Sequence, residues 1–208
     1  MNYLLIVISL LIPVQQVRGP IAPEEAKRAA YQWVRFYKDV SIGEPFYQFN
    51  GSPDTVLAHT NDLSNTMLRS VTGTWWQFPV IQRGKVVESV GVVYDADDKQ
   101  YEMCGTQKMS DYLRAFLEFR DSLKPEYNLA DLHISGCGHF WVIHKNLLAV
   151  EVIPVDNEAW LTLTGKHRKF DGGWKVGKRY QITDAIPNIR RAAIRFIESR
   201  ELDKSVVR

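Results

Sequence analysis

The segment at residues 73–104 constrains the fold of this chain most strongly, because its apolar and polar residues alternate over three short stretches. Successive side chains of a β-strand point to opposite faces of the sheet, so this alternation predicts strands with one buried face. Turn residues at 82–85 and 95–98 separate the three stretches. The segment therefore predicts a three-stranded antiparallel meander.

Three other segments predict helices, because apolar residues recur at helical spacing after residues that favour a helix start. The first begins near Pro23 and ends near Asp39, the second is capped by Ser110, and the third opens at Thr183. Further strands are expected at 46–49, 56–59, 139–144, 147–154 and 159–164, followed by a hairpin at 170–174 and a last strand through Tyr180.

The elements of the second half follow the same order as those of the first, and residues 70–81 align with residues 133–144. This order predicts an α+β fold of antiparallel β-meanders, with helices packed on one face of each. It divides the chain into one unit at 20–125 and a second at 126–208. A duplication and two similar but unrelated pieces of structure both fit the pattern.

The amino-terminal residues indicate export. Residues 3–12 form an apolar run that is shorter than the roughly 20 residues needed to span a bilayer. Val17 and Gly19 occupy the two positions that a signal peptidase reads, so residues 1–19 are predicted to be a signal peptide. The mature chain is then secreted or periplasmic and has no membrane span. A buried amino-terminal strand and a retained anchor are the alternatives.

The two cysteines of the chain, Cys104 and Cys137, have no CxxC partner and no zinc-type spacing. In an oxidising compartment such a pair most often forms a disulfide, which is the bond predicted here. Two free thiols are the alternative.

Cys137 is also the sharpest candidate for catalysis, because His133 and His139 are close in sequence and a thiolate nucleophile needs a neighbouring imidazole. However, a Gly-Cys-Gly turn that enters a strand is not the helix start or elbow that usually presents a nucleophile. The sequence also lacks a phosphate-binding loop, a Rossmann glycine pattern and an HExxH helix. The chain is therefore expected to be non-catalytic and to use no cofactor, with Cys137 structural.

No metal site is predicted either. His139 and His144 are five positions apart in a predicted strand and so face opposite sides, while His133 and His139 would share a side only across an irregular turn. The acidic residues at 95–98 resemble the opening of a calcium loop but lack its glycine and its final glutamate. An acidic hairpin turn is the expected structure there.

Positive charge is concentrated in residues 165–180, which contain six Lys and Arg residues against one Asp. Basic groups position anions and aromatic rings stack on bases or sugars, so this segment is a candidate for polyanion or glycan binding. The residues concerned are Lys166, Arg168, Lys169, Trp174, Lys175, Lys178 and Arg179. The alternative is an exposed hairpin with its aromatic residues in the core. A net charge of +2 argues against a dedicated nucleic-acid binder.

The sequence IAPEEAKRAAYQWV at 21–34, followed by FPVIQRGKVVESVGVVYDADDKQY at 78–101, resembles the PepSY and streptopain-propeptide type of module. The resemblance covers about residues 20–104. It implies a cystatin-like module that acts outside the cytoplasm and accompanies or inhibits peptidases.

Three functional hypotheses follow. The first is a secreted non-catalytic protein that binds another macromolecule, with a peptidase as the implied partner. The second is a small secreted hydrolase that uses Cys137 with His139 or His133. The third is polyanion or glycan binding through the basic segment.

Overall fold

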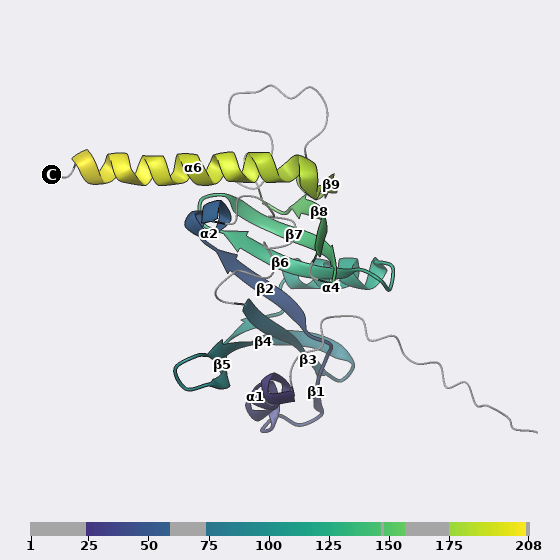
Figure 1. Cartoon of the computed structure of the whole chain (residues 1–208). Coiled ribbons are helices and arrows are strands. Elements are labelled where there is room, and N and C mark those ends of the chain that lie inside the picture. The colour runs from purple at the N-terminus through teal and green to yellow at the C-terminus, as the bar shows by residue number, and fades with distance from the viewer. Residues whose placement is uncertain (1–23, 59–73, 147, 157–174, 207–208) are drawn as a thin grey trace, which may run out of the picture.

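The computed structural model describes residues 24–58, 74–146, 148–156 and 175–206. Within these residues, nine strands form one mainly antiparallel sheet, and four helices pack against it (Figure 1). This architecture confirms the predicted α+β class. Three predicted features lie outside the described residues: the signal peptide at 1–19, the strand at 159–164 and the hairpin at 170–174.

The helices are α1 (Glu24–Val34), α2 (Pro53–Ala58), α4 (Asp111–Ser122) and α6 (Ile182–Val206). The strands are β1 (Val40–Ile42), β2 (Phe46–Gly51), β3 (Thr74–Gln82), β4 (Lys85–Asp95), β5 (Gln100–Lys108), β6 (Asn128–Ile134), β7 (Gly138–Lys145), β8 (Leu148–Pro154) and β9 (Tyr180–Gln181). The sheet has the order β5-β4-β3-β2-β6-β7-β8-β9, and β1 pairs with β3 beside β2. Among the described helices, none combines the length and apolar character that crossing a membrane requires.

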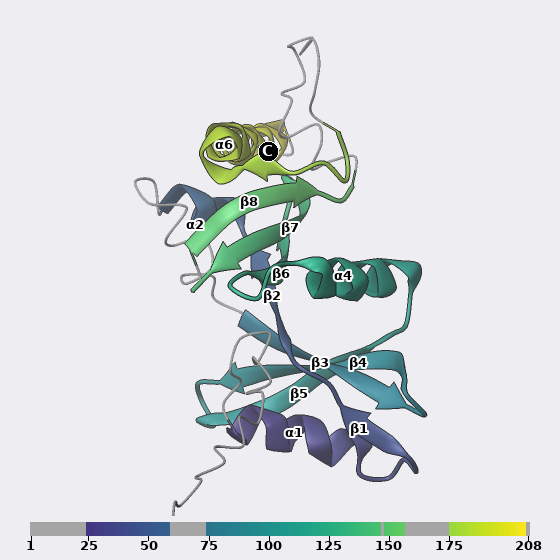
Figure 2. The same ribbon diagram turned by 90° about the vertical axis from the view of Figure 1, so that its right-hand side faces the viewer.

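The predicted three-stranded meander is confirmed as β3, β4 and β5. Its inner face carries Trp76, Phe78 and Val90, which are buried under α1. Alanines at positions 26 and 30 of α1 are fully buried, so their small side chains let the helix lie close to the sheet. This half of the molecule is at the bottom of Figures 1 and 2.

β2 joins this meander to the second half of the chain. It pairs antiparallel with β3 and parallel with β6, which is the one parallel pairing within the described residues. Phe46 and Phe49 lie three positions apart and are buried in different core clusters. The units predicted at 20–125 and 126–208 therefore share one sheet, and duplication stays one of the two alternatives for their similarity.

In the second half, α6 and α4 lie on opposite faces of the β6–β8 meander (Figure 2). The strands predicted at 139–144 and 147–154 are confirmed as β7 and β8. The helix capped by Ser110 is confirmed as well, since the Ser110 hydroxyl accepts a hydrogen bond from the Leu113 amide. The final helix begins at Ile182, one residue before its predicted start.

One strand assignment from the sequence is wrong, and β1 and β6 were not predicted; the first helix also ends at Val34 and not near Asp39. Residues 53–58 form the short helix α2 in place of a strand at 56–59, because Pro53 suits the first turn of a helix and the Val56 amide bonds back to Ser52 O at 3.2 Å. β6 was not predicted, because it is buried on both faces and so lacks the alternation of a half-exposed strand.

The predicted disulfide between Cys104 and Cys137 is also wrong, because neither cysteine forms a disulfide. Cys104 lies on β5 and Cys137 in the turn between β6 and β7. Three strands separate β5 from β6, so a strand spacing of about 4.8 Å puts them roughly 19 Å apart. A disulfide requires Cα atoms within about 7 Å of each other.

Gly136 is the position where the β6–β7 turn meets α6. Its φ is 71°, and a Cβ at this position would overlap the ring of Phe196. We expect Gly136→Ala to lower the free energy of unfolding by about 2–4 kcal/mol, from backbone strain and from overpacking together. Urea unfolding measures this change.

Gly84→Ala is the matched control, since Gly84 has φ of 75° but no neighbouring atom within 4 Å of the added Cβ. Gly84→Ala should lower the free energy of unfolding by only about 1–2 kcal/mol, because backbone strain is its only cost. Equal losses in the two variants would show that contact with Phe196 contributes nothing.

Candidate functional site

A cluster of hydrogen-bonded polar and aromatic side chains lies between α4 and the β6–β7 hairpin. Its centre is Asp131 on β6, a carboxylate that is only 4% exposed. The Tyr112 hydroxyl donates to Asp131 Oδ1 at 2.5 Å, and His139 Nε2 lies 2.6 Å from the same oxygen. Trp141 Nε1 in turn donates to the Tyr112 hydroxyl at 2.7 Å. One carboxylate oxygen thus binds the side chains of Tyr112 and His139, and Tyr112 in turn binds Trp141.

Sheet register and helix capping explain why these residues meet. Asp131 pairs with Trp141, and His133 pairs with His139, in the antiparallel β6–β7 ladder. Alternate residues of each strand share a face, so all four side chains lie on the side of α4. Tyr112 reaches them from the first turn of α4, and its ring stacks on that of His139 with centroids 5.1 Å apart.

Burial and charge determine the protonation of this cluster. Burial, followed by the charge of Asp131, raises the pKa of Tyr112 far above its ordinary value, so its hydroxyl stays neutral. Burial alone would lower the pKa of His139, but the hydrogen bond and charge of Asp131 outweigh it, and the net shift is upward. The pair thus favours an imidazolium beside a carboxylate, an arrangement that anchors α4 and offers no nucleophile.

The sequence-predicted catalytic residues are only partly brought together. His133 and His139 are neighbours, with ring centroids 5.8 Å apart. Cys137 is fully buried on the opposite side of the sheet, in the core under α6. Burial raises the pKa of its thiol to about 11, which disfavours the thiolate. The geometry therefore does not assemble a Cys–His pair.

His144 is buried at 1% exposure, and neither ring nitrogen has a hydrogen-bond partner within the described residues. Its ring centroid is 6.3 Å from that of Tyr47 on β2. It lies on the face opposite to His139, as the sequence predicted. Burial lowers the pKa of His144 to about 4, so the imidazole is neutral at ordinary pH.

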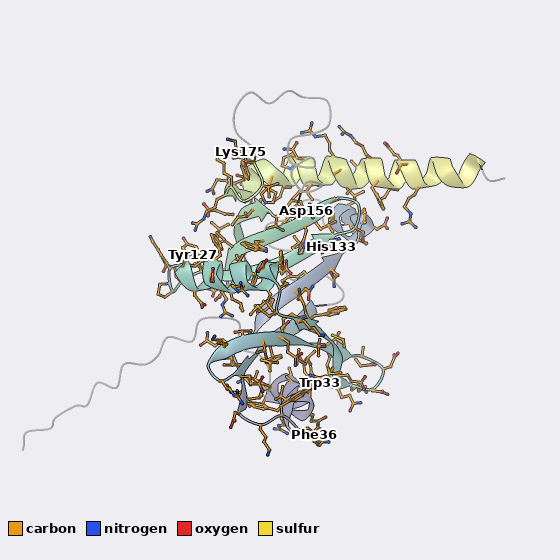
Figure 3. All side chains as sticks on the ribbon, turned by 180° about the vertical axis from the view of Figure 1, so that it is seen from behind. Trp33, Phe36, Tyr127, His133, Asp156 and Lys175 are labelled. Atoms are coloured by element: carbon orange, nitrogen blue, oxygen red, sulfur yellow. The ribbon has the colours of Figure 1, made fainter. Side chains whose placement is uncertain are left out.

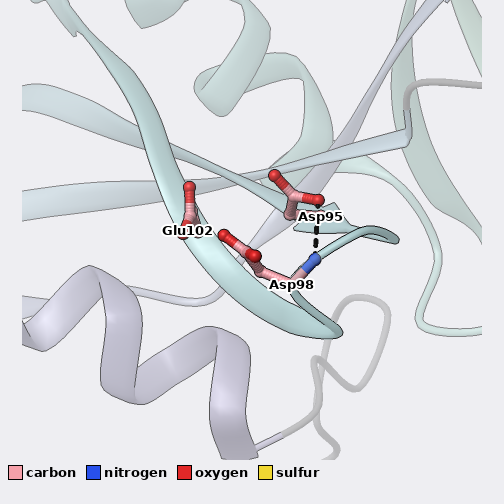
Figure 4. Close-up of side chains that lie close together, drawn as sticks. All are labelled: Asp95, Asp98 and Glu102. Atoms are coloured by element: carbon pink, nitrogen blue, oxygen red, sulfur yellow. Dashed lines mark hydrogen bonds between the residues drawn. The ribbon is translucent and has the colours of Figure 1, made fainter.

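The acidic residues at 95–98 form the β4–β5 hairpin turn, as expected. Asp95 Oδ1 accepts from the Asp97 amide at 2.8 Å and from the Asp98 amide at 3.2 Å. Carboxylate oxygens of Asp95, Asp98 and Glu102 lie within 4.8 Å of one another (Figure 4). The Asp95 carboxylate thus stabilises the turn itself.

Beside this turn, α1 and the β4–β5 hairpin enclose an open cavity of about 380 Å³. Tyr94 and Tyr101 contact edge to face in its wall, with centroids 5.2 Å apart. Arg28 of α1 and Lys99 of the hairpin add positive charge, and Glu25 adds one negative charge. The sequence analysis did not identify this cavity, because it forms only when α1 docks on the sheet.

Seven residues of the basic segment are proposed to bind anions, and the structure describes three of them: Lys175, Lys178 and Arg179. The other four lie outside the described residues: Lys166, Arg168, Lys169 and Trp174. Arg179 lies over the Phe119 ring at 4.9 Å and 3.8 Å from a Glu151 oxygen. Polyanion binding at this segment stays a prediction.

Three members of the Asp131 cluster were not predicted as site residues: Tyr112, Asp131 and Trp141. One sequence signal was available, since an aspartate inside the apolar stretch LADL breaks a run that is otherwise suited to burial. Their meeting, however, depends on the β6–β7 register and on the docking of α4.

The environments of the two cysteines predict different reactivity. We expect iodoacetamide at about pH 8.5 to alkylate exposed Cys104 in the folded chain, and buried Cys137 only after denaturation. Intact mass measurements with and without denaturant check this, and prior reduction should change nothing. Alkylation that needs a reductant would instead demonstrate a disulfide.

Because burial lowers the pKa of His144, we expect the fold to lose stability in acid. Its pKa is about 4 in the folded chain and 6.5 ordinarily, so the unfolded state takes up the proton first as pH falls. Stability should therefore be lost between about pH 6.5 and pH 4, by roughly 3 kcal/mol from this group. Denaturant unfolding across this range measures the loss.

His144→Phe is the matched test, because it fills the site without a titratable group. The variant should lose that part of the pH dependence, while the part due to carboxylates remains. The same slope in both proteins would rule out His144 as its source.

The chain matches no family model, no curated protein sequence and no solved structure.

Proposed function

We propose that this chain is a secreted, non-catalytic protein-binding module that takes up an extended segment of a partner along β5. The observation that carries the proposal is the open edge of the sheet at β5. Within the described residues, β5 pairs with β4 on one side and with no strand on the other. An edge strand with unpaired backbone groups is a template for an added strand.

The first half of β5 is the better template. A register irregularity opposite Gly91 and Val92 leaves Cys104 unpaired in the ladder and divides the strand in two. Such a bulge interrupts strand addition at that point. The regular stretch at 100–103 lies directly beside the cavity under α1.

Side chains near this stretch suit an apolar contact. Met103 is 40% exposed and Tyr94 is 49% exposed, although both are large hydrophobic residues. Backbone pairing along β5 gives affinity for any extended chain, and a pocket beside the strand adds selectivity for a side chain. Tyr94 and Tyr101 offer an aromatic wall for an apolar or aromatic residue of the partner.

The partner class follows from the resemblance to peptidase-associated modules, together with the absence of an assembled nucleophile among the described residues. Buried Cys137 is not available for catalysis, which favours binding over hydrolysis. A secreted peptidase is accordingly the first partner to test.

Peptides selected from a random decapeptide library against the full chain test the binding mode. Selected peptides should slow amide hydrogen exchange at 100–103, because added backbone hydrogen bonds protect these groups. Met103→Lys should weaken binding at least tenfold, about 1.4 kcal/mol, by placing a charge in the apolar contact.

Leu148→Lys is the matched control, since Leu148 is a strand residue with 41% exposure at a distant site. It should leave peptide affinity unchanged. Protection confined to other strands, or equal losses in the two variants, would refute binding at β5.

The partner class has a separate readout. The full chain should slow peptide hydrolysis by a papain-type peptidase, and the Met103→Lys chain should slow it less. If the chain binds peptides but does not inhibit the peptidase, a peptidase is refuted as the partner, while the β5 binding site is retained.

A further inference from the structure

We propose that His133 and His139 form a binding site for a divalent transition-metal ion of the Zn²⁺ type at the end of the β6–β7 hairpin. The two histidines are direct cross-strand partners. Their rings lie on one face of the sheet, with centroids 5.8 Å apart and planes at 79°. The proposal is independent of peptide binding, because β5 lies four places from β6 in the sheet.

The spacing of the pair suits one shared ion. A Zn–N bond is about 2.1 Å long, so two imidazole nitrogens on a tetrahedral ion lie about 3.4 Å apart. Cross-strand partners have Cβ atoms about 5 Å apart, a separation from which both rings reach one ion by side-chain rotation. The His133 side chain is exposed and makes no hydrogen bond within the described residues, so no such bond fixes the orientation of its ring.

Asp131 prepares His139 as a ligand. Its Oδ1 lies 2.6 Å from His139 Nε2, which places the Nε2 proton on that contact. The imidazolium that this pair favours carries its second proton on Nδ1, and a metal ion binds Nδ1 by displacing that proton. The surrounding bonds agree with this placement of the Nε2 proton, because Oδ1 also accepts from Tyr112, whose oxygen accepts from Trp141. A buried carboxylate that orients a histidine is the usual outer-shell partner of a metal-bound imidazole.

A second carboxylate lies near the pair. Asp156 follows β8, and the preceding Val155 amide donates to His139 O at 3.0 Å. Its negative charge acts on the His139 imidazole. Figure 3 labels His133 and Asp156, and both lie on the half of the molecule that carries β6–β8. Two negative charges near the site favour a cation.

The donor atoms select the class of metal. Imidazole nitrogens suit Zn²⁺, Cu²⁺ and Ni²⁺, whereas Ca²⁺ and Mg²⁺ take oxygen ligands. Two imidazoles leave positions on the ion for water or for a carboxylate. His133 is exposed and His139 is half-buried, so an ion reaches the pair from solvent without an opening of the fold.

Calorimetric titration of the full, chelator-treated chain with Zn²⁺ tests the site. The expected result is one site that is weakened at least tenfold in both His133→Ala and His139→Ala. Asp131→Asn should weaken it about 10- to 100-fold, as loss of an outer-shell partner does. His167→Ala, which removes a histidine elsewhere in the chain, is the control and should leave affinity unchanged.

His133→Ala is the decisive variant, since the His133 side chain is exposed and makes no hydrogen bond within the described residues. Its thermal midpoint without metal should equal that of the parent chain, so weaker Zn²⁺ binding reports a lost ligand and not a lost fold. Zn²⁺ should raise the midpoint of the parent and not that of this variant. Unchanged affinity in His133→Ala, an equal loss in His167→Ala, or no binding to the parent would each overturn the proposal.

Discussion

The double pairing of β2 is the constraint on which the rest of the structure depends. β2 is antiparallel to β3 and parallel to β6, so one short strand turns two meanders into one sheet. Its side chains also take part in all three apolar clusters: Phe46 under α4, Phe49 under α6, and Tyr47 against the clusters under α1 and α6. Burial of one phenylalanine stabilises a fold by roughly 1.5–3 kcal/mol, so each core depends on this strand.

The Asp131 cluster and the β5 edge show how one sheet can carry two different kinds of surface. At its centre, a buried carboxylate is hydrogen-bonded by Tyr112 and His139, and its bond to Tyr112 ties it to α4. At its edge, backbone groups and large apolar side chains face solvent.

The sequence was most informative where structure is local. Alternation and turn chemistry predicted β3–β5, and a serine cap predicted α4, because both signals act within a few residues. β6 was missed because burial on both faces removes alternation, and α2 was taken for a strand because six residues carry no helical period. The disulfide prediction is wrong because the spacing of two cysteines in the sequence does not determine how far apart their strands lie in the sheet.

The candidate site illustrates the same limit. His133 and His139 were identified from their closeness in sequence, and the hairpin does bring them together. Cys137, between them in the chain, enters the opposite core because a turn residue can face either side. Tyr112 joins the cluster from another element, so only the docking of α4 reveals it.

The parallel pairing of β2 with β6 also has a consequence for the order of folding. Gly51 pairs with Ile134, 83 positions later (134 minus 51), and closing so long a loop costs entropy that only the finished pairing recovers. Local hairpins such as β3–β4 need no such closure. We therefore expect β2 to remain an open edge until β6 has formed, which pulsed hydrogen exchange would detect as late protection of its amides. A growing chain would then expose a second strand template, one that vanishes in the native protein, until residue 134 is available.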